Sequence, residues 1–383
     1  MNFLNQMFTR VAPLPVGTHH MQAMQDEKPY RLHLRLQKNG SGLLILNAST
    51  VMQLNPTAAE CAFHFIKGTA PDEAAKQISA RYRVDRKTAL ADFNNFADRI
   101  QTLISTPDLD PASFLDFERV QPHSTDSTLR LDCALTYKLP PDTQADYAPV
   151  KRVDRELTTE EWKLILDKAW QAGIPHIVFT GGEATLREDL PQLIAHAEKN
   201  GQVCGLLTDG LKLADKDYLE LLLQTGLDHV MLILQPDEPR SWKAIETIVP
   251  QDLFLIVHFT LNKKNANEAK NIMEKIANLS VENISLSASD ANLLDELLEL
   301  QETANSLNLT IRWDLPVPYS ASHPVAVETQ DDNIPTGAGK TWMYVEPDGD
   351  VLPAQGEADK VLGNFLKDTW EVISKSSLPY KYE

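Results

Sequence analysis

A glycine pair beside a carboxylate is the most informative group of residues with chemical potential. Thr180-Gly-Gly-Glu183 follows an apolar run, His176–Phe179, that predicts a strand. Glycines at the end of a strand let a ligand approach the backbone closely, and a carboxylate beside them accepts hydrogen bonds from an ammonium group. A glycine turn before an acidic helix start, which the helix dipole favours, explains the same residues. We therefore treat Gly181, Gly182 and Glu183 as candidate ligand-binding residues.

The three cysteines of the chain, Cys61, Cys133 and Cys204, are widely separated, and none belongs to a C-x-x-C pair. An odd count excludes a complete disulfide framework. Zinc and iron–sulfur sites draw several thiolates from closely spaced positions. Each cysteine has apolar neighbours, so we interpret all three as small buried hydrophobic residues.

Length and charge limit the class of protein. The 383 residues are 43% hydrophobic and carry a net charge of -18, which predicts two or three domains with a sizeable core. An acidic chain without clustered Lys and Arg argues against nucleic-acid partners and anionic membranes. No apolar stretch is long enough to span a bilayer, and the first residues lack a signal-peptide core. We expect a cytoplasmic protein.

The elements that must position these residues fall into two patterns. Residues 1–28 are expected to form an irregular arm. Three short strands and three helices then follow in 29–105, as in a winged-helix-like domain, with strands expected at Tyr30–Leu36, Leu43–Leu46 and Thr50–Leu54. Either Asn55 or Thr57 is expected to cap the first helix, and Asp85 is expected to cap the third. Residues 106–127 are rich in Pro, Asp and Ser and predict a linker.

Strands then alternate with helices, the pattern of a parallel sheet that is either open or curled into a barrel. In both forms, ligands bind at the carboxyl ends of the strands. Thr158-Thr-Glu-Glu161 predicts a capped helix start. A hairpin is expected near the end of the chain, at Trp342–Val345 and Val351–Leu352. The six strands expected in the sheet are Leu129–Tyr137, His176–Phe179, Val203–Leu207, His229–Leu234, Leu253–Leu261 and Ile284–Leu286.

Several of these segments resemble the radical SAM superfamily. Thr180-Gly-Gly-Glu-Ala-Thr-Leu-Arg187 is similar to its second-strand motif, T-G-G-E-P-x-L-R, and Leu206–Gly210 is similar to its third-strand T-N-G with Asp209 in place of Asn. Phe259–Asn265 is similar to a fifth-strand segment. The resemblance implies an α/β fold with a partial (β/α)6 barrel over 128–315. It also implies contact with the amine of S-adenosylmethionine, and adds Thr208 and Asp209 to the candidate ligand-binding residues.

The cysteines of that family are replaced. Leu135–Tyr147 resembles the first-strand frame L-T-Y-x-C-N-x-x-C-x-x-C-Y, and Gly337–Gly356 with Leu362–Asn364 resembles a SPASM segment, expected over 316–383. Neither Leu nor Ala has a donor atom, and oxygen ligands suit iron–sulfur poorly. We therefore expect no 4Fe-4S cluster and no S-adenosylmethionine binding. The five positions interpreted as lost cluster sites are Leu139, Thr143, Asp146, Thr336 and Ala354.

The small first domain resembles the PqqD-type peptide-recognition fold through the run Gly42–Glu60 and the later Ile66-Lys-Gly68. The resemblance implies that a peptide adds as a strand beside the third strand, where backbone groups give affinity. A helix over 88–104 would complete the groove. A purely structural domain explains the same pattern. The candidate peptide-binding residues are Thr50, Val51, Met52, Gln53 and Leu54.

Together these patterns lead to one expected function and two alternatives. We expect a catalytically inactive, radical-SAM-like pseudoenzyme that binds a peptide or protein in a peptide-modification or cofactor-maturation system. A non-radical enzyme or small-ligand-binding protein is the first alternative. It would use Asp146, Glu183, Thr208, Asp209 and Gln235 for acid–base work or a hard cation. A structural subunit of a larger complex is the second.

Overall fold

The computed structural model describes residues 13–25, 28–46, 50–106, 128–141, 151–311, 337–357 and 359–376. The chain divides into two compact units. The first comprises Met1–Gln121 with Gln171–Pro175, and the second comprises Pro122–Trp170 with His176–Glu383. The boundary after Gln121 falls inside the segment that the sequence predicts as a linker.

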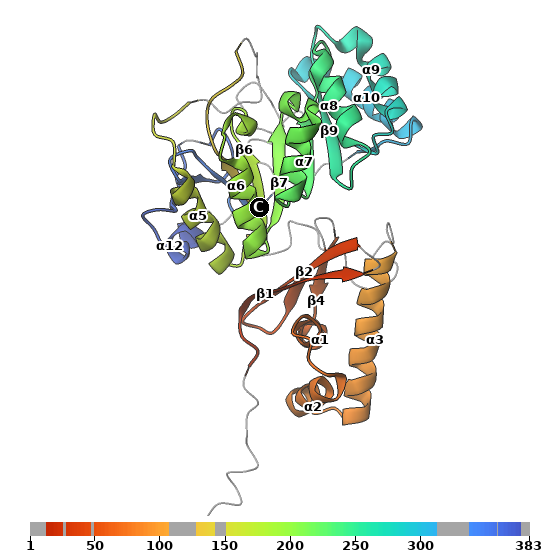
Figure 1. Cartoon of the computed structure of the whole chain (residues 1–383), viewed down its shortest axis with the longest axis vertical. Helices are drawn as coiled ribbons and strands as arrows, with labels where there is room; N and C mark the ends of the chain where they lie inside the picture. The colour runs from red at the N-terminus through yellow and green to blue at the C-terminus, as the bar shows by residue number, and fades with distance from the viewer. Residues whose placement is uncertain are drawn as a thin grey trace, which may run out of the picture. The chain divides into compact units, whose positions relative to one another are not determined.

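The first unit has a four-stranded antiparallel sheet in the order β1-β2-β3-β4. Its strands are β1 (Gly17–Gln25), β2 (Lys28–Leu36), β3 (Gly42–Leu46) and β4 (Thr50–Leu54). Three helices follow, namely α1 (Pro56–Ile66), α2 (Pro71–Tyr82) and α3 (Arg86–Ser105) (Figure 1). Helix α1 packs on the sheet and against α3. The core is built from apolar residues of both layers, including Leu32, Leu34, Leu54, Ala59, Ile78 and Ile100.

Strand β1 corrects the expectation of an irregular arm over 1–28. It pairs with β2 along its whole length, from Gly17 opposite Leu36 to Gln25 opposite Lys28. Its side chains are only half-buried or exposed, and the two adjacent histidines weaken the alternation by which a strand is recognised. The partner strand supplies the order that the local sequence lacks.

The expected helix caps are confirmed. The Asn55 side chain accepts a hydrogen bond from the Ala58 N–H (2.9 Å), and Asp85 accepts one from the Thr88 N–H (3.0 Å). Each satisfies a backbone donor that the first turn of a helix leaves free. The lengths of α1 and α3 are therefore encoded locally.

The second unit contains a ten-stranded sheet in the order β11-β10-β9-β8-β7-β6-β5-β12-β13-β14. All pairs from β12 through β5 to β11 are parallel, which confirms the α/β class. The strands are β5 (Arg130–Ala134), β6 (His176–Thr180), β7 (Val203–Thr208), β8 (His229–Ile233), β9 (Phe254–Leu261), β10 (Asn283–Ala288), β11 (Thr310–Ile311), β12 (Trp342–Val345), β13 (Asp350–Leu352) and β14 (Gly363–Asn364).

Helices connect the parallel strands, as such a sheet requires. They are α5 (Thr159–Gln171), α6 (Leu190–Asn200), α7 (Lys216–Gln224), α8 (Pro239–Ile248), α9 (Ala269–Asn278) and α10 (Leu294–Ser306), and α12 (Trp370–Ser376) lies near the end of the described chain (Figure 1). The expected hairpin is confirmed as β12 and β13. The sequence did not predict that β12 also pairs in parallel with β5.

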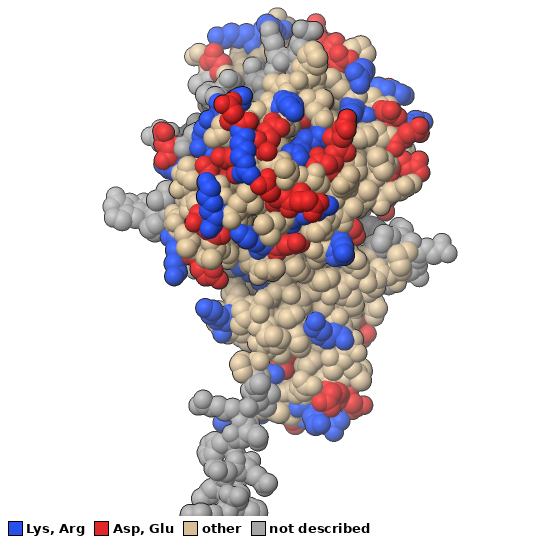
Figure 2. Space-filling model, turned by 60° about the vertical axis from the view of Figure 1, so that its left-hand side comes forward, with Lys and Arg blue, Asp and Glu red and all other residues tan. Residues whose placement is uncertain are grey.

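Charged side chains are mixed on the molecular surface. Figure 2 shows acidic and basic groups interleaved in the upper part of the view and few charged groups in the lower part, although the chain as a whole carries a charge of -18. Among the described helices, none is both long and apolar enough to cross a membrane.

Candidate functional site at the carboxyl ends of β5, β6 and β7

The glycine pair lies where the backbone beyond β5 crosses the end of β6. The Gly182 N–H donates to Thr136 O (2.7 Å), and the Glu183 N–H donates to Lys138 O (2.8 Å). A Cβ atom on Gly182 would lie 2.2 Å from Lys138 O, and one on Gly181 would lie 2.4 Å from Thr136 O. Gly181 also has a φ of +132°, which side chains rarely allow. The glycines thus admit the chain's own backbone, which is a role the sequence did not reveal.

The Glu183 carboxylate is held by the chain itself. Its Oε1 atom accepts hydrogen bonds from the Thr185 N–H (2.9 Å) and the Thr208 hydroxyl (2.8 Å). Its Oε2 atom accepts one from the Asp209 N–H (2.8 Å). Glu183 is 1% exposed and caps the short 3-10 helix η3 (Ala184–Leu186). The structure therefore brings the second- and third-strand candidates together around one buried carboxylate.

Asp209 is a second buried acid at this point. It is 1% exposed, its Oδ1 atom accepts from the Leu211 N–H (2.9 Å), and its Oδ2 atom is buried without a hydrogen-bond partner. Burial and then the charge of Glu183 raise the pKa of Asp209 to about 7. Two carboxyl groups side by side disfavour double ionisation. Burial beside Glu183 thus favours the protonated form of Asp209, the residue that stands at the Asn position of the motif.

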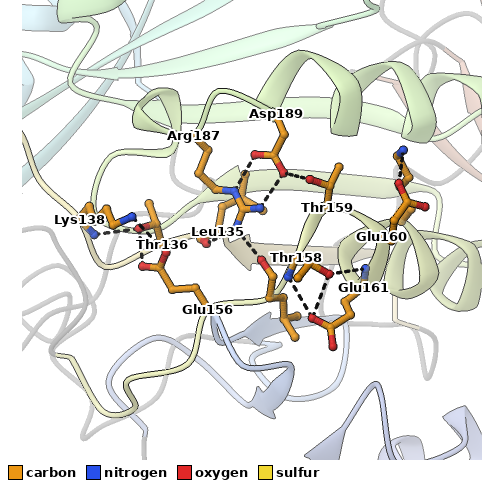
Figure 3. Close-up of polar contacts among 12 residues, drawn as sticks. Leu135, Thr136, Lys138, Glu156, Thr158, Thr159, Glu160, Glu161, Arg187 and Asp189 are labelled. Atoms are coloured by element: carbon orange, nitrogen blue, oxygen red, sulfur yellow. Dashed lines mark hydrogen bonds and ion pairs between the residues drawn. The ribbon is translucent and has the colours of Figure 1, made fainter.

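Arg187 joins three segments behind the glycine turn (Figure 3). Its Nη1 atom donates to Leu135 O (3.1 Å) and to Leu157 O (2.9 Å), and its Nε and Nη2 atoms bind the Asp189 carboxylate. The Thr159 hydroxyl also donates to that carboxylate (2.6 Å). This clamp fixes the end of β5 to the start of α5 and to the loop before α6. No sequence signal pointed to it beyond the R of the second-strand motif.

The start of α5 has the predicted capping arrangement. The Thr158 N–H donates to Glu161 Oε2 (3.0 Å), and the Glu161 N–H lies 3.4 Å from the Thr158 hydroxyl (Figure 3). This reciprocal pair is a capping box. Glu160 is paired with Lys163 at 2.7 Å, so the two adjacent acids do not form a common site.

A polar cavity of about 370 Å³ opens beyond the end of β5. Its lining residues are Tyr137, Lys138, Lys151, Asp154 and Glu156. The Thr136 hydroxyl and the Tyr137 N–H both donate to Glu156 Oε1 (2.6 and 3.2 Å). The charges within it are balanced by ion pairs, at 3.7 Å between Lys138 and Glu156 and at 2.7 Å between Lys151 and Asp154.

Arg152 ties the segment before α5 to the terminal hairpin. Its guanidinium lies 2.7 Å from Asp350 Oδ2 and 3.6 Å from carboxylate oxygens of Asp348 and Glu346. The Tyr137 hydroxyl also donates to Glu346. Sequence patterns missed this cluster because its members are up to 209 positions apart, and only pairing of β12 with β5 brings them together.

A second polar cluster lies on one face of β9 and β10. His258 Nδ1 is 3.0 Å from the Ser285 hydroxyl, and Nε2 is 3.0 Å from the Ser287 hydroxyl and 3.2 Å from that of Thr260. The register pairs His258 with Ser285 and Thr260 with Ser287. His258 is fully buried, and both of its ring nitrogens have hydroxyl partners, as in a core histidine whose polar atoms are satisfied.

The residues interpreted as lost cluster positions are only partly described. Leu139 is half-buried and Ala354 is buried, while Thr143, Asp146 and Thr336 lie outside the described residues. Cys133 and Cys204 are buried in β5 and β7 with β6 between them, and Cys61 is buried in α1. Burial raises the pKa of the Cys61 thiol to about 12 and also raises that of Cys133.

The described residues contain no group of three His, Cys, Asp or Glu side chains able to hold a metal ion. They therefore do not offer the three thiolates that the sequence motif of the family supplies to an iron–sulfur cluster. Of the acid–base set, Gln235 donates its backbone N–H to the Ser241 hydroxyl (3.1 Å), and Asp146 lies outside the description. Among the described members, Glu183, Thr208 and Asp209 are in mutual contact.

Strand β4 holds the candidate peptide-binding residues. It pairs with β3 on one side and is an edge of the described sheet on the other. Met52 and Leu54 are buried and Gln53 is exposed, which is the alternation of a strand with one face on a core. Strand β1 forms the opposite edge.

Comparison with known proteins matches part of the chain to a family. Residues 133–254 match the family described as "Radical SAM superfamily". A PqqA peptide cyclase of Streptomyces rochei is 28% identical over 57% of this chain and 67% of its own length. An Fe-coproporphyrin III synthase of Methanosarcina barkeri is 28% identical over 49% of this chain and 51% of its own length. The chain thus spans between half and two thirds of these relatives.

Solved structures agree on the fold. SuiB of Streptococcus suis, in a crystal structure described as bound to the precursor peptide SuiA, gives a TM-score of 0.59 at 15% identity. That match covers 94% of this chain and 89% of the other. SuiB bound to S-adenosylmethionine gives a TM-score of 0.58 over 89% of this chain. The partial barrel expected from the sequence is consistent with these neighbours.

These findings contradict two expectations from the sequence. A catalytically inactive pseudoenzyme is contradicted because the named relatives are a cyclase and a synthase. The expected absence of a 4Fe-4S cluster and of S-adenosylmethionine is contradicted because the matching family is radical SAM and the relatives include a PqqA peptide cyclase. The replaced cysteines concern only the cluster ligands that these sequence motifs supply. They do not show that the chain is inactive.

The glycine turn, the buried Glu183 and the Arg187 clamp all lie within the matched segment, at the end of the sheet where α/β folds bind ligands. Residues 133–254 therefore match the radical SAM superfamily, in a chain whose relatives include a PqqA peptide cyclase.

Proposed function

We propose that this chain works in the modification of a peptide and that its first unit binds that peptide as an added strand along β4. The observation that carries the proposal is that β4 is an edge strand of its sheet, and that one face of this sheet is packed on helices. Unpaired backbone groups of an edge strand supply hydrogen bonds to an extended peptide, and alternate side chains supply specificity. The peptide-directed name of one relative supports the same class of substrate.

The resemblances to a PqqD-type domain and to a SPASM segment are part of this proposal. Strands β2, β3 and β4 followed by α1, α2 and α3 support a PqqD-like unit. The hairpin of β12 and β13, with its Pro347–Asp350 turn, supports a SPASM-like tail. Both are inferred from element order and motif, and the unit boundaries at 29–105, 128–315 and 316–383 are part of the proposal.

Site-specific photo-crosslinking tests the peptide site. Benzoylphenylalanine replaces Gln53 on β4 or, as a matched control, Gln22 on β1; both glutamines are exposed on edge strands of the same sheet. The full chain is irradiated with biotinylated synthetic peptides that represent short reading frames beside its gene. We expect crosslinks from position 53 that an unlabelled copy of the same peptide competes away. Equal labelling from both positions, or none from position 53, contradicts the proposal.

The second part of the proposal concerns the glycine turn. We infer that Gly181, Gly182, Glu183, Thr208 and Asp209 shape a pocket for S-adenosylmethionine at the ends of β6 and β7, with Glu183 acting as a brace through its internal hydrogen bonds. Isothermal titration calorimetry of the full chain with S-adenosylmethionine is the test. Saturable binding that Gly182→Ala abolishes is expected. Binding that survives this change would locate the ligand elsewhere, and no binding would remove this part of the proposal.

The absence of a nucleic-acid partner, the cytoplasmic location and the alternative of a structural subunit are predictions from composition and pattern. Gel filtration of a cell extract tests the subunit alternative, because a structural subunit elutes only as part of a larger assembly.

A further inference from the structure

Two buried carboxyl groups meet where the glycine turn touches the end of β7. The Asp209 N–H donates to Glu183 Oε2 (2.8 Å), and the two side chains lie within hydrogen-bonding reach of each other. Both residues are 1% exposed. Of their four carboxyl oxygens, three accept hydrogen bonds from backbone or hydroxyl donors. The fourth, Asp209 Oδ2, is buried without a partner.

One proton shared between the carboxyl groups of Asp209 and Glu183 would satisfy the unpaired oxygen and avoid two adjacent negative charges. A carboxylate oxygen has two lone pairs, and Glu183 Oε2 uses one for the Asp209 N–H. A proton on Asp209 Oδ2 would let this oxygen donate a hydrogen bond. Glu183 Oε2 would then accept a second hydrogen bond. Two ionised carboxylates would instead place like charges side by side in a buried site, which is strongly disfavoured.

The basic side chains near Glu183 and Asp209 do not neutralise these two acids. Arg240 of α8 is near enough to interact with Asp209 but donates to Leu211 O (2.8 Å). Lys212, in the 3-10 helix η4 (Leu211–Ala214), donates to Thr185 O (2.7 Å). Tyr218 of α7 lies near Glu183, and its buried hydroxyl has no hydrogen-bond partner. Among the residues that the structure describes, no Lys, Arg or His forms an ion pair with Glu183 or Asp209.

We propose that Asp209 is a positioning residue that holds one proton against Glu183, and that loss of this proton loosens the turn at Gly181–Glu183. The link is direct, because the same Glu183 residue donates its N–H to Lys138 O and accepts from Thr208. Ionisation of both acids pushes Glu183 away from β7, and the turn moves with it. The proposal does not depend on the peptide site or on any ligand.

The direction in which the pKa of Asp209 is shifted determines how the stability of the fold changes with pH. The pKa of Asp209 is raised from 3.8 to about 7 by burial and by Glu183. The stabilisation is complete below the unfolded-state pKa and is lost as the pH rises through the folded-state value. Two buried histidines act in the opposite direction, because burial lowers the pKa of His33 to about 3 and that of His229 to about 4. The pH profile of the wild type alone is therefore not diagnostic.

The comparison with Asp209→Asn isolates the pair. Asn keeps the shape and donates a hydrogen bond without titrating. From pH 5 to pH 7, we expect the unfolding constant of the wild type to rise roughly ten- to fiftyfold relative to that of Asp209→Asn. Asp215→Asn, at the exposed start of α7, is the control and should follow the wild type.

Infrared difference spectroscopy of the full-length wild type supplies a readout independent of stability. The carbonyl band of a protonated carboxyl group should be present at pH 6, disappear above pH 8, and be missing from Asp209→Asn. Glu183→Gln should shift its titration to lower pH. Absence of the band in the wild type at pH 6, or its persistence in Asp209→Asn, would overturn the proposal. Burial also raises the pKa of Asp132 and of Glu346, so the band is assigned to Asp209 by its loss in Asp209→Asn. Absence of any such band from the wild type at pH 6 overturns the proposal even where the variant fails to fold.

Discussion

Replacing Gly182 by Ala tests how the turn is built. The added Cβ would lie 2.2 Å from Lys138 O and 2.7 Å from Tyr137 O, well inside van der Waals contact. These are backbone atoms, which cannot rotate away as a side chain does. The turn must therefore move back from the segment beyond β5. That motion breaks the hydrogen bonds from the Gly182 N–H to Thr136 O and from the Glu183 N–H to Lys138 O.

The size of the effect follows from those two hydrogen bonds. Leaving a buried donor or acceptor unpaired costs about 1–3 kcal/mol each, so we expect Gly182→Ala to lower the free energy of unfolding by roughly 3–5 kcal/mol. Urea unfolding followed by tryptophan fluorescence measures it, because Trp162 of the same unit is fully buried.

Gly349→Ala is the matched control for that experiment. Its φ is +88°, but its Cβ would meet only ordinary contacts at 3.5 Å or more. Conformational strain alone should cost roughly 1–2 kcal/mol there. If Gly182→Ala costs no more than Gly349→Ala, the close approach does not determine the stability of the turn and the reasoning is refuted.

Three further changes probe other contacts. Arg187→Lys keeps the charge but loses the planar fork that binds Leu135 O, Leu157 O and Asp189, so urea unfolding should show a loss of about 2–3 kcal/mol; Arg155→Lys, in an exposed pair, should change stability by less than about 0.5 kcal/mol. His229→Gln removes a histidine whose pKa burial lowers to about 4; stability lost by the wild type as the pH falls from about 6.5 to 4 should shrink in the variant, and an unchanged acid profile would contradict the assignment. Arg152→Ala leaves three carboxylates without their common cation and should make unfolding of the terminal hairpin easier, seen as faster hydrogen exchange in β12 and β13; unchanged exchange would show that strand pairing with β5 suffices.

The sequence predicted well those features that are encoded locally. The caps at Asn55 and Asp85, the capping box at Thr158 and the alternation of strands with helices each depend on neighbours within a few positions. The terminal hairpin is of the same kind. These elements sufficed to predict the α/β class.

Features made by distant segments were beyond sequence patterns. Strand β1 is ordered by pairing with β2, and the Arg152 cluster exists because β12 lies beside β5. The glycine turn was predicted, but its close approach to the backbone of Thr136–Lys138 was not. Inactivity was inferred from the replaced cysteines. Replacement of residues in a cysteine motif does not exclude the kind of activity that is named in the relatives.

Hydrogen exchange of the full chain tests the central claim, that a peptide adds to the edge strand β4. The amides of Thr50–Leu54 are compared with those of Gly17–Gln25, the opposite edge of the same sheet, with and without each peptide encoded by the short reading frames beside the gene. The account predicts that one peptide slows exchange in β4 and leaves β1 unchanged. Protection of β1 instead, or of neither strand by any of these peptides, would contradict it.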